Sequence, residues 1–107
     1  MKLTFEEACS AAADLFEAAP ELWTSRALGR DAKDVSIGPL EDEAEKWCSG
    51  GMVMAAMGEH NYMAFCAFCR LQPFATALGF EWTSDANNLG GRLVAIKMLR
   101  MAAGEIK

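Results

Sequence analysis

Several features that mark common functional classes are missing from this sequence of 107 residues. No apolar run reaches the roughly 18 residues that a membrane-spanning helix needs. The N-terminus becomes acidic at Glu6 and has no continuous apolar core, so we expect no signal peptide and a cytoplasmic location. No Gly-x-x-x-x-Gly-Lys phosphate loop is present. The single histidine, His60, has no serine or cysteine beside it, so a nucleophile–histidine pair is not indicated.

Metal and redox chemistry also have little support, although Cys9, Cys48, Cys66 and Cys69 are present. Cys66 and Cys69 have the spacing of a zinc knuckle, but they lie in an apolar helical segment and no second pair exists. In the cytoplasm we expect all four to be free thiols that pack as small hydrophobes. We therefore expect no metal, no cofactor and no catalytic residues. Metal binding by Cys48, Cys66 and Cys69 is the minor alternative.

The charge of the chain is unevenly placed, with a net value of −5. Residues 1–45 contain eleven acidic and four basic side chains, whereas residues 46–107 contain four acidic and six basic ones. Clustered lysine and arginine, typical of direct nucleic-acid binding, are missing. An acidic half favours steering toward a protein partner with a basic surface. The alternative is an acidic face that is merely solvated.

What the sequence does contain is enough apolar material for one core, because 52% of its residues are hydrophobic. Thr4 and Glu7 match a capping box at the start of a helix, and Pro20 ends that helix. Four segments have apolar residues at helical spacing: 4–19, 41–58, 61–79 and 89–104. We therefore predict an all-α domain covering residues 1–107, a compact bundle of about four helices.

The segment 41–58 is apolar on nearly every side, so we predict that it is the central helix of the bundle. Its acidic start, from Glu41 to Glu45, would complement the helix dipole. Gly50 and Gly51 disfavour a helix unless a neighbouring helix backbone approaches closely. In that arrangement Cys48 would face Cys69 on the following helix, which begins near Asn61.

Two irregular stretches, 22–40 and 80–88, interrupt the helical pattern, and long loops often have a function. In the first, a minimal β-hairpin at residues 23–37 is allowed, with 23–25 pairing with 35–37. In the second, Asp85, Asn87 and Asn88 precede a predicted helix and either cap it or bind a ligand. The tryptophans at 23, 47 and 82 lie at the core edge or line one pocket, and an exposed Trp23 or Trp82 would be a binding anchor.

Four short motifs follow one another along the chain: Trp23-Thr24, Ala27-Leu-Gly-Arg30-Asp31-Ala32, Ala44-x-x-Trp47-Cys48-x-x-Gly51 and Trp82-Thr-Ser-Asp85. This order resembles a family of small uncharacterised bacterial and phage proteins, described only as a domain of unknown function. The family has a Trp-Asn-Asp stretch where this chain has two residues between Trp82 and Asp85. The resemblance would cover about residues 4–103 and implies an architecture but no activity. The resulting candidate binding residues are Trp23, Arg30, Asp31, Trp82, Asp85, Asn87 and Asn88.

Three functional hypotheses remain open. The first is a small acidic, non-enzymatic interaction protein, phage-encoded and inhibiting a host protein such as a defence complex, in the manner of an anti-CRISPR protein. The second is a small-ligand-binding domain or an unrecognised enzyme that uses the 22–40 and 80–88 stretches. The third is a homo-oligomer that associates through Met-rich helix faces.

Overall fold

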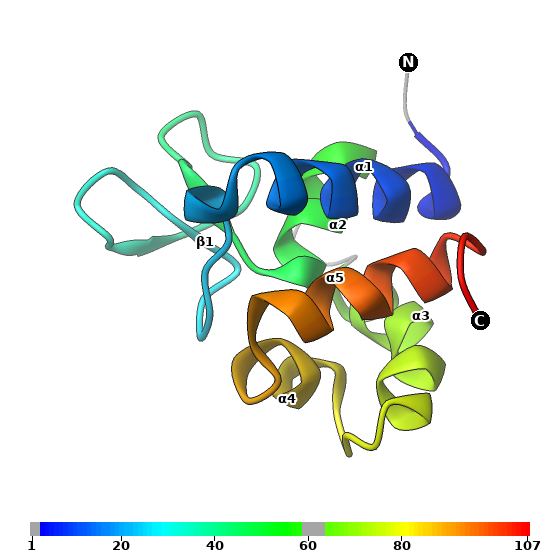
Figure 1. Ribbon diagram of the computed structural model, residues 1–107. Helices are drawn as coiled ribbons and strands as arrows, with labels where there is room; N and C mark the ends of the chain where they lie inside the picture. Colours follow the sequence, from blue (N-terminus) through cyan, green and yellow to red (C-terminus); the bar gives the residue numbers. More distant parts are fainter. Residues whose placement is uncertain (1–2, 59–63) are drawn as a thin grey trace.

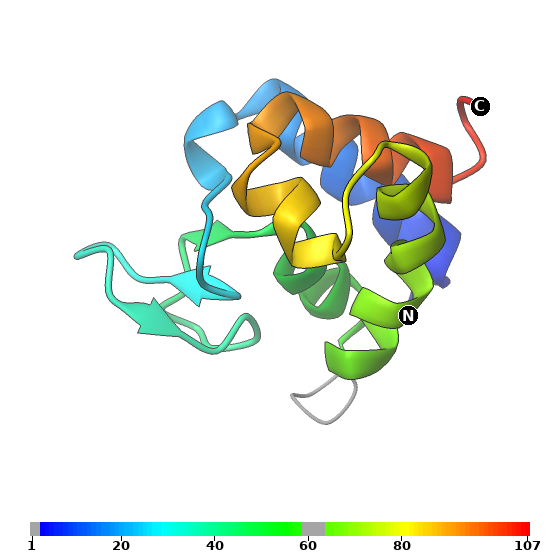
Figure 2. The ribbon, with the colours of Figure 1, turned by 90° about the horizontal axis from the view of Figure 1, so that it is seen from below.

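The computed structural model describes residues 3–58 and 64–107, without the side chains of 64–66. Its elements are α1 (Phe5–Ala18), the 3₁₀ helix η1 (Pro20–Leu22), β1 (Gly29–Arg30), β2 (Ser36–Ile37), β3 (Lys46–Trp47), α2 (Ser49–Met57), α3 (Ala64–Ala77), α4 (Thr83–Asn88) and α5 (Gly91–Ala102). Most of these described residues are helical and the sheet is small, which confirms the predicted mostly-α bundle. The small sheet and its loops extend to one side of the helices (Figures 1 and 2). The predicted helix start at Asn61, and His60, lie outside the described residues.

The first helix begins and ends as its sequence predicts. The Glu7 amide donates to the Thr4 hydroxyl at 3.2 Å, and the Thr4 amide donates to the Glu7 carboxylate at 2.9 Å. Both bonds together form the capping box and satisfy backbone donors that the helix itself leaves unpaired. The helix ends at Ala18, two residues before Pro20.

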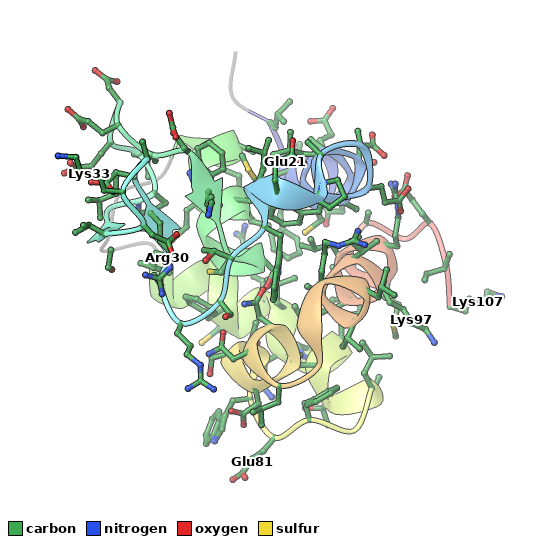
Figure 3. All side chains as sticks on the ribbon, turned by 60° about the vertical axis from the view of Figure 1, so that its left-hand side comes forward. Glu21, Arg30, Lys33, Glu81, Lys97 and Lys107 are labelled. Atoms are coloured by element: carbon green, nitrogen blue, oxygen red, sulfur yellow. The ribbon has the colours of Figure 1, made fainter. Side chains whose placement is uncertain are left out.

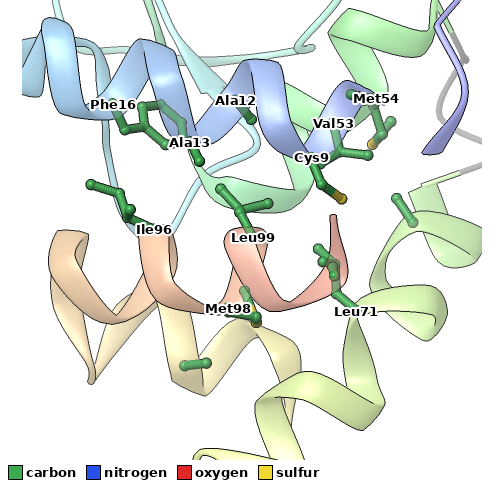
Figure 4. Close-up of a cluster of buried hydrophobic side chains, with 14 of the residues drawn as sticks. Cys9, Ala12, Ala13, Phe16, Val53, Met54, Leu71, Ile96, Met98 and Leu99 are labelled. Atoms are coloured by element: carbon green, nitrogen blue, oxygen red, sulfur yellow. The ribbon is translucent and has the colours of Figure 1, made fainter. Parts of the chain in front are cut away.

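The core lies where α1 and α5 pack against α2 and α3. Figure 4 shows Phe16 and Ala13 of α1 directed toward Ile96 and Leu99 of α5, with Leu71 of α3 beside them. The largest fully buried apolar side chains are Phe16, Met54, Leu71, Met98, Leu99 and Val53. Met54 and Met98 are fully buried, so these methionines fill the core rather than forming the exposed face expected for self-association.

The central helix starts eight residues later than predicted, at Ser49 instead of Glu41. Long-range pairing explains the difference, because the Glu45 amide donates to the Arg30 carbonyl and the Cys48 amide to the Leu28 carbonyl. These bonds place residues 46–47 in strand β3. Cys48 then becomes the N-cap, and its sulfur accepts the Gly51 amide proton at 3.2 Å.

The sheet differs from the predicted hairpin in its partner strands. The segment 36–37 is a strand, but it pairs antiparallel with β1 at 29–30 and not with residues 23–25. Strand β1 also pairs antiparallel with β3, so the strand order is β2-β1-β3. Trp23 instead forms a parallel bridge with Trp47, and the Thr24 amide donates to the Trp47 carbonyl at 2.9 Å.

The glycine pair admits close neighbours, as predicted, but the neighbours are not a helix backbone. A Cβ at Gly51 would lie 1.9 Å from the Leu28 carbonyl oxygen, which belongs to the segment leading into β1. A Cβ at Gly50 would lie 2.7 Å from the Phe68 ring of α3. The helix therefore contacts the sheet segment on one side and an aromatic ring on the other.

The helix predicted at residues 89–104 is α5, and the stretch 80–88, which was predicted to be irregular, contains a further short helix. Residues 83–88 form α4, and α5 begins at Gly91, whose φ of +85° places a left-handed residue at the junction. Arg100 of α5 reaches across to α1 and contacts Asp14 at 2.6 Å and Glu17 at 3.1 Å. Its second arm contacts Glu105 at 2.8 Å, and only 18% of the Arg100 side chain is exposed.

We predict that Gly51→Ala destabilises the fold strongly. The added methyl group would meet backbone atoms of Leu28, which cannot move aside as the end of a flexible side chain can. The expected loss is about 3 kcal/mol in the free energy of unfolding, measured by urea denaturation. Gly38→Ala is the matched control, since its Cβ would meet only the Glu41 side chain, at 3.3 Å. A Gly51→Ala variant as stable as Gly38→Ala would show that the Leu28 segment is not held against α2.

We also predict that the Glu105 contact is lost in acid. Hydrogen bonds from Arg100 and Ser10 hold the pKa of Glu105 below its ordinary value of 4.5. A lowered pKa stabilises the folded state at pH values above 4.5, and this contribution disappears as the pH falls through the folded-state pKa. The difference in unfolding free energy between the natural protein and Glu105→Gln should therefore shrink below pH 4.5. In an Arg100→Met background the difference should be small at every pH.

Candidate functional site

Asn87 lies at the centre of the region where three of the candidate residues, Trp23, Asn87 and Asn88, meet. Its amide oxygen accepts the Trp23 indole N–H at 2.9 Å and the Ser49 amide N–H at 3.0 Å. Its amide nitrogen donates to the Thr24 carbonyl at 3.2 Å and to the Asn88 side chain at 3.0 Å. Both lone pairs and both protons of the Asn87 amide are thus used. Because Asn87 is only 2% exposed, its role in this region is structural.

Asn87 caps a helix, but not the one that follows it in the sequence. The amide that it accepts belongs to Ser49, the first residue of α2. Asn88 likewise binds the backbone of a distant segment, because its side-chain oxygen accepts the Arg26 amide N–H at 2.9 Å. The expectation that these asparagines cap the next helix is therefore wrong, since both lie inside α4 and bind segments from elsewhere in the chain.

Arg30 and Asp31 hold the shape of the sheet and its first loop. The Arg30 guanidinium donates to the Thr24 hydroxyl at 3.0 Å and to the carbonyls of Asp34 and Ser25 at 2.9 and 3.1 Å. One Asp31 carboxylate oxygen accepts the amides of Lys33 and Val35, both at 2.9 Å. The side-chain hydrogen bonds of Arg30 and Asp31 are thus made within residues 24–35.

The loops of the sheet form an acidic surface, which we call the acidic loops and define as residues 31–34 and 41–45. They carry Asp31, Asp34, Glu41, Asp42, Glu43 and Glu45. All of these are exposed except Asp31, which is partly buried. The nearby basic residues are Arg30, Lys33 and Lys46, and Lys46 pairs with Asp34 at 3.2 Å. Asp31, Glu43 and Glu45, with Lys33 and Ala32, line a shallow hollow of about 360 Å³ between the two loops.

Trp82 lies outside the hydrogen-bond network of Asn87 and is 58% exposed. It lines an apolar hollow of about 490 Å³ with Phe68, Cys69, Gln72, Thr83 and Ser84. Asp85 lies in the first turn of α4 and is not among the residues that line this hollow. Figure 3 shows Lys33 of the acidic loops and Glu81, next to Trp82, at separate edges of the molecule.

A second, smaller hollow of about 240 Å³ lies beside the first. Its lining residues are Arg26, Ala27, Leu28, Cys48, Phe68, Ser84, Asn87 and Asn88. Phe68 and Ser84 line both hollows, so the two adjoin and we call them together the Trp82 groove. The groove brings together the two irregular stretches, because Arg26 comes from 22–40 and Ser84 from 80–88.

The described thiols differ in their surroundings. Burial raises the pKa of Cys9 to about 12, with a smaller contribution from the charge of Glu6. Burial also raises the pKa of Cys48, even though backbone amides such as that of Gly51 donate to its sulfur. Cys69 is exposed, so it does not share the buried position expected for a partner of Cys48. Within the described residues, no three side chains of histidine, cysteine, aspartate or glutamate gather as metal ligands would.

Comparison with known proteins adds no assignment. No protein-family model, no curated protein and no solved structure matches the chain. None of the described helices is long and apolar enough to cross a membrane. The resemblance to the uncharacterised bacterial and phage family therefore remains a proposal.

Sequence reasoning missed most residues of the Trp82 groove, among them Arg26, Phe68 and Ser84. Arg26 has a φ of +64°, a conformation that its residue type does not reveal. Phe68 resembled an ordinary core residue, because it lies in an apolar helical segment. Ser84 was interpreted only as one of the two residues that separate Trp82 from Asp85. The signal that the sequence did offer was Trp82 itself, a binding anchor if it faced solvent, and the structure shows it exposed.

We predict that Asn87→Ala lowers the free energy of unfolding by about 3 kcal/mol, because it leaves the Trp23 indole, the Ser49 amide and the Thr24 carbonyl without their partner. Ser49→Ala is the matched control from the same cluster. The Ser49 hydroxyl is buried and has no hydrogen-bond partner among the described residues, so its removal should raise stability by up to about 1 kcal/mol. Urea denaturation of both variants measures the contrast, and an equal loss in both would contradict it.

Proposed function

We propose that this protein is a non-enzymatic interaction protein that binds a basic surface of a protein partner through its acidic loops. The observation that carries the proposal is the charge on these loops. Residues 31–46 contain six carboxylates and two lysines, against a net charge of −5 for the whole chain. Most of the excess negative charge therefore lies on one protruding part of the molecule (Figure 1).

The loops are suited to this role because their shape is held internally. Asp31 orders the first loop by accepting two backbone amides, and Lys46 is drawn to Asp34. The second loop then presents Glu41, Asp42 and Glu43 to solvent. The hollow between the loops is large enough for a lysine or arginine side chain of the partner. Clustered charge of one sign speeds association with a surface of opposite sign and selects against acidic partners.

A more specific form of the proposal is a phage-encoded inhibitor of a bacterial defence complex, acting in the cytoplasm in the manner of an anti-CRISPR protein. Clustered carboxylates have the same charge sign as a nucleic-acid backbone. A basic surface that normally binds nucleic acid is therefore a suitable target, and occupying it would block the host protein. The Trp-Cys-x-x-Gly and Trp82–Asp85 motifs, which resemble those of small phage and bacterial proteins, support this form.

Charge neutralisation tests the proposal. The variant Glu41→Gln/Asp42→Asn/Glu43→Gln removes three charges from the second loop. The matched control Glu6→Gln/Glu21→Gln/Glu81→Gln removes three charges from exposed positions elsewhere. Each tagged protein is used to capture partners from a bacterial lysate at low salt, with quantification by mass spectrometry. We expect a stoichiometric basic partner with the natural protein and the control, reduced at least tenfold with the loop variant and by high salt.

Two results would contradict the proposal: no stoichiometric partner at low salt, or a partner that the loop variant retains as well as the control does. A partner displaced from the natural protein by added nucleic acid would support the more specific form. A second candidate function, binding of a small ligand, is favoured by a different observation, namely the Trp82 groove.

A further inference from the structure

The Trp82 groove joins three parts of the chain that are far apart in sequence. Phe68, Cys69 and Gln72 come from α3, Ser84 from the start of α4, and Arg26 from the segment before β1. Its two hollows, of about 490 and 240 Å³, together fall within the range typical of small-molecule sites. The groove lies apart from the acidic loops, so a function for it is independent of the one proposed for them.

The larger hollow is suited to an apolar ring. All of the described residues that line it are uncharged, and Phe68 and Trp82 supply aromatic rings. Its two main polar side chains are already used. The Gln72 oxygen accepts the Thr83 amide at 3.0 Å, its nitrogen donates to the Glu81 carbonyl at 2.7 Å, and the Thr83 hydroxyl donates to the Phe68 carbonyl at 2.8 Å. The hollow therefore offers a ligand mainly ring faces and hydrocarbon.

The smaller hollow has the opposite character, because Arg26 is the charged residue among those that line it. The bond from the Arg26 amide to Asn88 ties its backbone to α4. Its side chain is exposed, and no carboxylate in the described part of the chain lies within 4 Å of its guanidinium. A planar guanidinium suits a carboxylate, which it can bind through two parallel hydrogen bonds.

We propose that the Trp82 groove binds a small aromatic carboxylic acid, whose ring packs against Trp82 and Phe68 and whose carboxylate pairs with Arg26. The uncharged aromatic end and the cationic end adjoin along the Phe68–Ser84 wall, so one molecule with a ring and a carboxylate on a short linker complements both. Affinity comes mainly from the ring in the larger hollow. The carboxylate supplies orientation and discriminates against uncharged analogues.

The test uses 4-phenylbutyrate as the probe and 4-phenylbutan-1-ol as its uncharged analogue, each titrated into the full chain and followed by two-dimensional NMR. We expect the acid to bind with a Kd of about 1 mM, as is usual for a ligand with so few non-hydrogen atoms. The alcohol should bind at least fivefold more weakly. Chemical-shift changes should be centred on residues 26, 68 and 82–84.

Two variants separate the contributions of ring and charge. Arg26→Asn removes the guanidinium and keeps a residue type that tolerates positive φ, so it should weaken the acid at least fivefold and leave the alcohol unchanged. Trp82→Ala should weaken both probes at least fivefold. Lys97→Gln and Leu93→Ala are matched controls at exposed positions outside the groove and should change neither affinity.

Three outcomes would overturn the proposal. The first is no shift of these residues at 10 mM acid, in a protein that melts as the natural chain does. The second is an equal affinity for the acid and the alcohol, or a loss of affinity in Leu93→Ala as large as that in Trp82→Ala. Either result would indicate adsorption to exposed apolar side chains. The third is a natural protein that sediments as a dimer and a Trp82→Ala variant that sediments as a monomer. In that case a second copy of the chain would fill the groove. A thermal melt of each variant confirms that folding is intact.

Discussion

The arrangement of the molecule depends on the hydrogen bonds made by the side-chain amide of Asn87. It is buried and makes four hydrogen bonds, to Trp23, Thr24, Ser49 and Asn88. A buried amide is stable only when its donors and acceptors are all used, so these contacts permit one relative placement of three segments. The placement sets α4 against the start of α2 and against the segment that leads into the sheet.

A second constraint acts at the same place, where Gly51 of α2 lies against the Leu28 carbonyl. Only a residue without a Cβ allows this close approach. The contact holds the segment at the base of β1 against α2. The Cys48 amide donates to the same carbonyl. The sheet is therefore attached firmly at its base, while its acidic loops extend away from the helices (Figure 2).

These two constraints produce two surfaces with opposite preferences. The acidic loops favour a cationic partner, because carboxylates outnumber lysines there. The Trp82 groove favours an apolar, anionic ligand, because rings line one end and Arg26 the other. The buried residues of the candidate set, above all Asn87, serve to hold these surfaces in position.

Local signals in the sequence were enough for the helical character and for several helix ends. The capping box at Thr4 and the stop at Pro20 depend on neighbours within a few positions, so they can be recognised without the fold. Tertiary structure decided the start of α2, the sheet pairing and the roles of Asn87 and Arg26. Those features depend on bonds between residues as many as 64 positions apart, and a local pattern does not encode which distant group becomes the partner of a buried polar atom.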